Sequence, residues 1–383
     1  MIYLDNSATT KPYKEVLDTF MKVNETLYAN PSSIHSFGGK ADDLIKRSRE
    51  QVADLLGVEG SEVFFTSGGT ESNNLAVKGT AMQYKNRGRH IITSRIEHPS
   101  VKKAVEDLEA FGFRITYVGV DEDGRVDPRE IAAALTDDTI LVSIMHVNNE
   151  VGTIQPIREI GALLNERPKT LFHVDAVQAC GKIPLDLHAA GVDMCSLSSH
   201  KIHGIKGTGV LYVRSGVRLS PLLSGGEQEG SLRSGTENTG GIAAFAKALR
   251  MHLKEREESL PHMEEIKGYL RKGLSKLPYV TVHTPEINSA PHILNFSIEG
   301  FKGEVMVHSL DRHGIYLSTT SACSSRQHKP SETLLAMGVS DVRANSSLRV
   351  SLSFHTTMQE ARTFLETLER EIQSLTKTMR RSR

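Results

Sequence analysis

The most constraining feature of this chain is a series of short apolar segments that alternate with predicted helices. Several of these segments, such as 139–145 (TILVSIM), are apolar almost without interruption. Runs of this kind are typical of strands buried on both faces, as in a parallel sheet covered by helices. The predicted strands are 62–66, 90–94, 113–120, 139–145, 170–175, 192–198 and 208–214, with helices at 71–86, 99–111 and 156–166 between them. The pattern predicts an α/β domain with a seven-stranded, mainly parallel sheet.

The pattern changes on either side of this region. A helix is predicted from Pro12, and a second amphipathic helix ends at Gly57. Beyond Asn238 a long charged helix runs to about Lys276 and is interpreted as a connector. Short strands near 279–283, 293–298 and 347–353 and helices at 303–312 and 358–376 follow it. We therefore expect a large domain over 13–250 and a smaller α+β domain over 251–383, which the segment 1–12 is expected to join.

Bulk properties exclude several classes of protein. The chain has 46 basic and 46 acidic residues, which argues against a dedicated nucleic-acid binder and against polybasic membrane attachment. No apolar run is long enough to span a bilayer, and the start has no signal-peptide pattern. Three sparse cysteines form no disulfide framework and no zinc-binding spacing. We expect a cytoplasmic protein without a structural metal.

Polar residues follow the predicted strands one after another. In a parallel sheet the carboxyl ends of the strands lie at one edge, where ligands bind. The residues concerned are Thr70, His98, Asn149, Asp175 and Lys201.

The segment Thr66–Asn74 (TSGGTESNN) has the composition of a tight turn leading into a helix. Free backbone N–H groups at a helix start form an anion site, so Gly69 and Thr70 are candidates for binding phosphate. The segment matches neither a Walker A loop nor GxGxxG. A capped strand–helix turn without a ligand is the alternative.

Asp175 ends an apolar strand in the segment HVDAVQ. A carboxylate there is suited to a cation such as a protonated ring nitrogen, and Gln178 could contact a ring oxygen. A helix-capping aspartate is the alternative. His98 could stack on a planar ligand and move a proton, or be structural. The amide of Asn149 could meet a ring substituent or only shape its turn.

Lys201 closes the segment Ser198–Lys201 (SSHK), just before a glycine-rich stretch. A lysine at the mouth of a buried strand is a candidate for covalent chemistry with a carbonyl compound, although a strand-end lysine can simply reach solvent. A phosphate turn, a carboxylate for a ring nitrogen and a lysine on one edge together fit pyridoxal phosphate, which requires all three.

Two further residues lie near the C-terminus. Cys323 lies in a long loop of small and polar residues, where an exposed thiol suggests reactivity, whereas Cys180 and Cys195 lie in apolar surroundings typical of core thiols. Arg349 lies within a strand and requires an anion, either a substrate carboxylate or an acidic residue in a domain-packing ion pair.

Six motifs in order resemble one family. They are SGGTESNN, MHVNNEVG, HVDAVQ, SSHKIHGIKGTG, RSGTEN and SSACSS. Together they resemble the cysteine desulfurases of the NifS/IscS type, which are pyridoxal-phosphate enzymes of aminotransferase class V and fold type I. The resemblance extends from YLDNSATT near the N-terminus to the arginine strand at 349. The SSACSS form resembles the long-loop group of the family.

The resemblance implies a role for each matching residue. Lys201 would bind the cofactor covalently, Asp175 would pair with its ring nitrogen, and Gln178 would contact its ring oxygen. His98 would stack on the ring and act in acid–base chemistry, with Asn149 nearby. Arg349 would bind the substrate carboxylate and Cys323 would carry a persulfide. Phosphate ligands would be Gly69, Thr70, Ser198, His200 and, from the neighbouring subunit of a homodimer, Thr236.

The implied activity is transfer of sulfur from L-cysteine to Cys323, with release of alanine. The sulfur would pass to an acceptor protein in iron–sulfur cluster assembly or in tRNA or cofactor thiolation. The basic C-terminus Arg380–Arg383 departs from the ending that housekeeping members use to contact their scaffold, so the acceptor is left open. Two alternatives are a selenocysteine lyase or other class V aminotransferase, which would not depend on Cys323, and a non-catalytic sulfur relay, which would not need Lys201 and Asp175.

Overall fold

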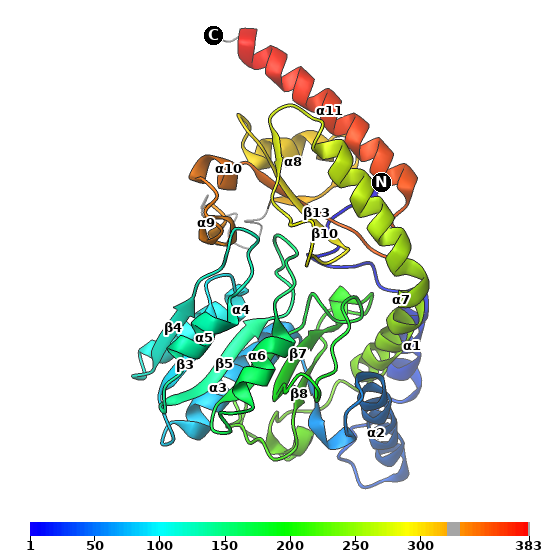
Figure 1. Cartoon of the computed structure of the whole chain (residues 1–383). Helices are drawn as coiled ribbons and strands as arrows, with labels where there is room; N and C mark the ends of the chain where they lie inside the picture. The colour runs from blue at the N-terminus through cyan, green and yellow to red at the C-terminus, as the bar shows by residue number, and fades with distance from the viewer. Residues whose placement is uncertain (320–329, 382–383) are drawn as a thin grey trace.

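A seven-stranded sheet forms the larger part of the molecule in a computed structural model, which describes residues 1–319 and 330–381 (Figure 1). Its strand order is β2-β8-β7-β6-β5-β3-β4. Only β8 runs antiparallel to its neighbours among these strands. The strands are β2 (Val63–Thr66), β3 (His90–Ser94), β4 (Arg114–Val118), β5 (Thr139–Met145), β6 (Leu171–Asp175), β7 (Met194–Ser198) and β8 (Gly209–Val213). The prediction of a mainly parallel sheet of seven strands is confirmed.

Helices cover both faces of this sheet, because its strands carry apolar side chains on both. Ile91 and Leu141 pack with α3 and α4 on one face. Their neighbours Ile92 and Val142 pack with α2, α6 and the start of α7 on the other. The helices are α1 (Lys14–Thr26), α2 (Ser36–Leu56), α3 (Gly69–Tyr84), α4 (Pro99–Glu109), α5 (Pro128–Ala134), α6 (Ile157–Leu164) and α7 (Thr239–Leu274). Uninterrupted apolar strands therefore produce a three-layer arrangement.

A smaller α+β unit lies beyond one edge of this sheet (Figure 1). Its antiparallel sheet has the order β12-β13-β10-β9 and shares a separate apolar core with α8, α11 and the end of α7. A two-stranded parallel sheet joins β1 to β11. The elements are β1 (Ile2–Tyr3), β9 (Val280–Val282), β10 (Ile293–Ile298), β11 (Ile315–Tyr316), β12 (Ser318–Thr319), β13 (Ser347–Ser351), α8 (Gly303–Asp311), α9 (Glu332–Ala336), α10 (Asp341–Asn345) and α11 (Met358–Arg381).

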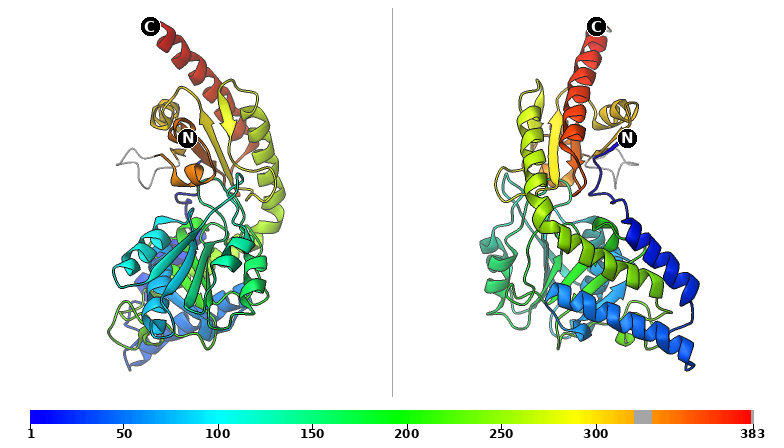
Figure 2. Two further views of the ribbon diagram at one scale, coloured as in Figure 1. Left: turned by 60° about the vertical axis from the view of Figure 1, so that its left-hand side comes forward. Right: turned by 90° about the vertical axis from the view of Figure 1, so that its right-hand side faces the viewer.

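The connecting helix α7 takes part in both cores. Phe245 and Leu249 belong to the core of the large sheet, whereas Ile266 and Leu270 belong to that of the small unit. Figure 2 shows this helix running from one unit to the other, with α1 and α2 beside its first half. The boundary predicted at residue 250 therefore falls inside a continuous helix.

The N-terminal segment spans the junction of the two units. Leu4 lies in the core of the small unit, while the backbone amides of Thr10 and Tyr13 donate to the carbonyls of His200 and His203. These bonds hold the backbone outside helical geometry, so α1 begins at Lys14 rather than at the predicted Pro12.

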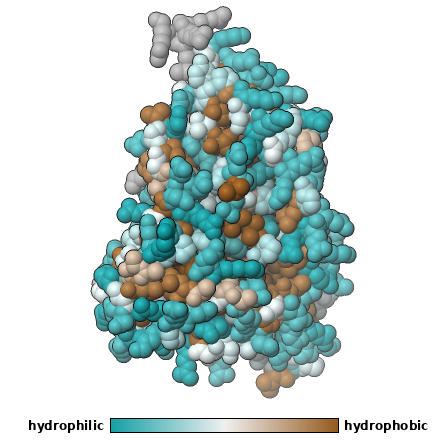
Figure 3. Space-filling model, viewed as in Figure 1, coloured by the Kyte–Doolittle hydropathy of each residue, from teal (hydrophilic) through white to brown (hydrophobic). Residues whose placement is uncertain are grey.

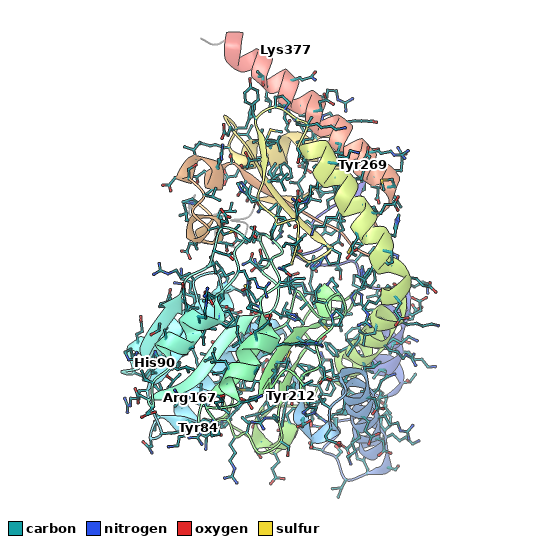
Figure 4. All side chains as sticks on the ribbon, in the orientation of Figure 1. Tyr84, His90, Arg167, Tyr212, Tyr269 and Lys377 are labelled. Carbon is teal, nitrogen blue, oxygen red and sulfur yellow. The ribbon has the colours of Figure 1, made fainter. Side chains whose placement is uncertain are left out.

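The surface carries no membrane-spanning element in the part of the chain that is described. None of the helices in residues 1–319 and 330–381 is long and apolar enough to cross a bilayer. On the face drawn in Figure 3, apolar residues form small groups among hydrophilic ones. Figure 4 labels His90, the first residue of β3, at the edge of the large sheet opposite the small unit.

Candidate active site

A cavity of about 580 Å³ lies at the carboxyl edge of the large sheet. Residues that follow β2, β3, β5, β6 and β7 line it, together with Ala8 and Thr9 of the N-terminal segment. Nine of the twelve predicted site residues lie in its wall, namely Gly69, Thr70, His98, Asn149, Asp175, Gln178, Ser198, His200 and Lys201. The topology thus brings together side chains that are up to 132 positions apart in the sequence (69 to 201).

The glycine turn forms one wall of the cavity. Gly68 precedes α3 and supplies no capping side chain, so backbone N–H groups at the helix start remain available to an anion. A Cβ at Gly69 would lie 2.7 Å from Val177, and one at Gly209 would lie 2.6 Å from the Cα of Gly68. A residue larger than glycine therefore does not fit at Gly69 or Gly209 without a shift of the neighbouring atoms. The Lys206 side chain, which the sequence reasoning did not single out, adds a cation to the cavity wall.

Asp175 lies buried at the end of β6. Its Oδ2 accepts a hydrogen bond of 2.7 Å from Asn73 Nδ2, and its Oδ1 accepts one of 3.0 Å from the backbone of Val177. The second bond closes a turn, and because the described residues between β6 and β7 form no helix, the helix-capping alternative is wrong. These donors hold the carboxylate in place at the cavity wall without a cationic partner in the described residues.

Asn73 and Ser100 connect Asp175 to His98. Asn73 Nδ2 also donates to Ser100 Oγ at 2.8 Å, and Ser100 Oγ lies 2.7 Å from His98 Nδ1. Sequence reasoning missed both residues. Asn73 lies one helical turn after Gly69, and that spacing was the available signal for a second cavity-facing side chain on α3.

Lys201 follows β7 in a short 3-10 helix (Ser199–Lys201) and reaches the N-terminal segment. Its Nζ donates to the carbonyl oxygen of Ser7, and to that of Ala8 at 2.8 Å. Gln178 Nε2 donates to the same Ser7 carbonyl at 3.0 Å. The N-terminal YLDNSATT segment therefore provides the polar partners of both side chains.

Burial keeps several nearby groups neutral. The pKa of His200 falls to about 4 because the ring is buried and Lys201 and Lys206 lie nearby. The pKa of the buried Cys180 thiol rises to about 11, and that of Cys195 also lies well above its usual value because it is buried. These two thiols are therefore poor nucleophiles, as expected for core cysteines.

Two predicted residues in the described part of the chain, Arg349 and Thr236, do not line the cavity. Arg349 lies on β13 and donates to the carbonyl oxygen of Asn149 at 2.8 Å and to Asp5 Oδ1 at 3.0 Å. The ion pair that the sequence left as the alternative thus exists in this structure. Thr236 lines a separate, neighbouring cavity of about 200 Å³. Cys323 lies outside the described residues.

Comparisons with known proteins agree along nearly the whole chain. Residues 2–364 match the family described as Aminotransferase class-V. The chain is 48% identical to a NifS/IcsS protein homolog of Lactobacillus delbrueckii subsp. bulgaricus over 98% of both chains. It is 42% identical to a cysteine desulfurase IscS of Dictyoglomus turgidum over 98% of this chain and 95% of that one. A solved NifS-like protein superposes with a TM-score of 0.92 at 40% identity, covering 98% of this chain and 99% of that one.

The chain belongs to the class V aminotransferases, among those of the NifS/IscS type.

The site of this class V protein is suited to a polar ligand. Gln178 Oε1, Asn73 Oδ1 and His200 Nδ1 are buried atoms at the cavity wall that have no hydrogen-bond partner among the described residues. An unsatisfied buried polar atom costs about 1–3 kcal/mol, so these three atoms leave hydrogen-bonding capacity beside the cavity that water or a bound molecule can meet. The glycine turn, the buried carboxylate and the lysine add free backbone N–H groups, an acceptor and an amine to the same wall.

Proposed function

We propose that this protein is a cysteine desulfurase that uses pyridoxal phosphate to convert L-cysteine to L-alanine and an enzyme persulfide. The observation that carries the proposal is the convergence of Lys201, Asp175 and the Gly69 turn on one cavity. Family membership supports the same reading, because relatives with 41–43% identity over nearly their whole length are named cysteine desulfurase IscS.

The residues at the cavity fit this cofactor group by group. Backbone amides at Gly69 and Thr70, with Ser198 and His200, would hold the phosphate, and Lys206 would offset its charge. Asp175 would accept a hydrogen bond from the ring nitrogen, with Gln178 and Asn149 beside the ring substituents. His98 would stack on the ring, and Lys201 would hold the cofactor covalently. The bound cofactor supplies an electron sink for the carbanion at the substrate α-carbon.

Lys201 is the group that would move the substrate α-proton. Its amine reaches the carbonyls of Ser7 and Ala8, and Ala8 lines the cavity. These carbonyls would hold and orient the amine when a substrate takes its place. The two N–H groups that hydrogen-bond to buried Asp175 would hold its carboxyl group beside the ring position.

The sulfur step balances without an added oxidant. The thiolate of Cys323 attacks the substrate sulfur, the carbon–sulfur bond breaks, and the carbon takes up a proton to give alanine. Cysteine and the enzyme thiol thus become alanine and a persulfide. Cys180 and Cys195 are unsuited to this step because burial raises the pKa of both thiols.

L-cysteine is the proposed substrate, and Arg349 the proposed partner of its carboxylate. A related solved structure at 34% identity is titled SspA in complex with cysteine. Arg349 Nε is buried and has no hydrogen-bond partner among the described residues, so a donor remains besides those used for Asp5 and Asn149. We further propose a cytoplasmic homodimer that gives its sulfur to an acceptor protein.

Two variants test this function. Lys201→Ala is expected to lose the yellow absorbance of bound cofactor and to form no alanine. Cys323→Ala is expected to keep the absorbance but to lose transfer of cysteine sulfur to an acceptor thiol. The measurements are the absorbance spectrum, alanine release and persulfide labelling of the intact chain.

Cys180→Ala is the matched control, because it removes a thiol that lies outside the cavity. It is expected to retain persulfide formation. If Cys323→Ala transferred cysteine sulfur as well as the wild type, the desulfurase function would be refuted. A preference for selenocysteine, undiminished in Cys323→Ala, would instead indicate the lyase.

A further inference from the structure

His98 forms an asymmetric set of contacts. It precedes α4, and its Nδ1 accepts a hydrogen bond of 3.2 Å from the backbone N–H of Ser100. The hydroxyl of Ser100 lies 2.7 Å from the same nitrogen. His98 Nε2 makes no hydrogen bond to any residue that the structure describes, and the ring lines the cavity. One nitrogen thus faces the protein and the other faces the cavity.

The backbone contact decides where the proton of the ring lies. A peptide N–H can only donate, so Nδ1 must offer its lone pair and carry no proton. Neutral imidazole has one proton, which must then lie on Nε2.

The Ser100 hydroxyl reinforces this choice because of Asn73. Asn73 Nδ2 donates to Ser100 Oγ, which leaves the hydroxyl proton free to point at His98 Nδ1. The orientation of the Asn73 amide is itself fixed by Asp175, because a rotated amide would place Oδ1 against the carboxylate oxygen. Asn73 thus donates to Asp175 on one side and to Ser100 on the other, and Ser100 in turn donates to His98.

We propose that Asn73 and Ser100 are positioning residues that hold His98 neutral with its proton on Nε2, so that it presents a hydrogen-bond donor and not a base to the cavity.

Three physical effects support this assignment. A second proton on Nδ1 would meet the Ser100 N–H head-on. Burial is the largest effect and lowers the pKa of His98, Asp175 raises it by less than burial lowers it, and Lys201 lowers it by a still smaller amount. Burial and the Ser100 N–H therefore outweigh the charge of Asp175, and the cationic ring is disfavoured.

The catalytic consequence of this tautomer rests on the proposed function. If the cavity binds the cofactor and cysteine, His98 donates its Nε2–H to an acceptor on the bound molecule. Of the two side chains His98 and Lys201, only Lys201 then moves the α-proton of the substrate.

Nitrogen NMR of the cofactor-free full chain labelled with ¹⁵N-histidine tests the tautomer directly. His98→Gln identifies the His98 signals. In the wild type near neutral pH, Nδ1 is expected to resonate as an unprotonated nitrogen and Nε2 as a protonated one. A protonated Nδ1, with or without a proton on Nε2, would overturn the proposal.

Two variants test the positioning residues. Ser100→Ala and Asn73→Ala are each expected to shift the Nδ1 resonance further from the protonated position, because each removes or weakens the hydroxyl donor to this unprotonated nitrogen while the backbone N–H of residue 100 still donates to it. Asn74→Ala is the matched control, since Asn74 donates only to the carbonyls of Thr70 and Ser100. A variant that keeps the wild-type spectrum would overturn the role of that residue, and Ser100→Ala decides alone if Asn73→Ala does not fold.

The rate of alanine release provides a second test. For the loaded enzyme, Ser100→Ala is expected to lower kcat for alanine release roughly tenfold, as the loss of one aligned hydrogen bond predicts. An unchanged kcat would contradict a role in the reaction. Failure of the proposed function would appear differently, as a wild-type protein that does not turn over cysteine while its His98 spectrum remains as expected.

Discussion

Glu97, next to His98, is a buried carboxyl group that should be protonated at neutral pH. Its Oε1 accepts from Ser94 Oγ at 2.6 Å and from the Met145 amide at 3.0 Å, whereas Oε2 has no partner among the described residues. Burial raises its pKa from 4.5 to about 8, and the negative charge of Asp175 adds to this. Glutamine reproduces the shape and hydrogen bonding of the protonated group.

The pH dependence of stability follows from this raised pKa. Between about pH 4.5 and pH 8 the native state holds a proton that the unfolded chain has released, so the free energy of unfolding falls as pH rises. The slope is at most about 1.4 kcal/mol per pH unit. We expect the Tm of the wild type, relative to Glu97→Gln, to decrease across this range in cofactor-free protein.

The exposed Glu166→Gln is the control for the loss of one acid. Its Tm difference from the wild type should stay nearly constant over the same range. A constant difference for Glu97→Gln as well would show that Glu97 ionises normally.

The site residues that the sequence predicted are placed by local apolar patterns, whereas those that it missed are placed by the packing of distant elements. Asp175 ends one buried strand and Lys201 follows shortly after another, so local apolar patterning locates them. Ser100 and Asn73 depend on how α3 and α4 pack, and Asp5 contacts Arg349 across 344 positions. Contacts between distant segments have no local sequence pattern. From the sequence, an ion pair was therefore only one of two possible partners for Arg349, the other being a substrate carboxylate.

At the scale of the element, α2 offers a paired test of helix energetics. Gly57 ends this helix with φ of 69°, a left-handed conformation in which a Cβ is strained although no atom lies within 4 Å of it. Gly39 lies inside the same helix, also in open space. Gly57→Ala should lower stability by about 1 kcal/mol, and Gly39→Ala should raise it by up to about 1 kcal/mol.

Each variant is the control of the other, because both add one methyl group to an open position on α2. Thermal unfolding should show Tm shifts of opposite sign, each roughly 2 °C for a chain of this size. Shifts of the same sign would mean that the added methyl groups meet something outside this chain.

Element boundaries were predicted closely where burial is local. All seven predicted strands of the large sheet end within two residues of their observed positions. The start of α1 also lies two residues from the predicted Pro12, where Thr10 and Tyr13 hydrogen-bond to the segment after β7. Strand order, and the closeness of β2 to β8, depend on the assembled sheet and could not be derived from the separate segments.

For the whole molecule, the open question is whether one site uses residues of two chains. Thr236 lines its own small cavity beside Ser67 and Gly207, which also border the main cavity. The family resemblance places this threonine in the site of a partner subunit. A residue that contributes across a two-fold axis leaves each site incomplete in a single chain.

Mixed dimers decide between the two arrangements. Lys201→Ala and Thr236→Ala chains, carrying different tags, are co-expressed and the mixed dimer is purified. If Thr236 acts across the interface, the Thr236→Ala chain receives an intact threonine from its partner and keeps its own Lys201. One of the two sites is then complete, and alanine release should reach about half of the wild-type rate per dimer.

If Thr236 acts within its own chain, both sites lack one residue, and the mixed dimer should release alanine at about half the rate of the Thr236→Ala homodimer. Since Lys201→Ala is expected to be inactive by itself, any rate above that of the Thr236→Ala homodimer must come from a site built by both chains.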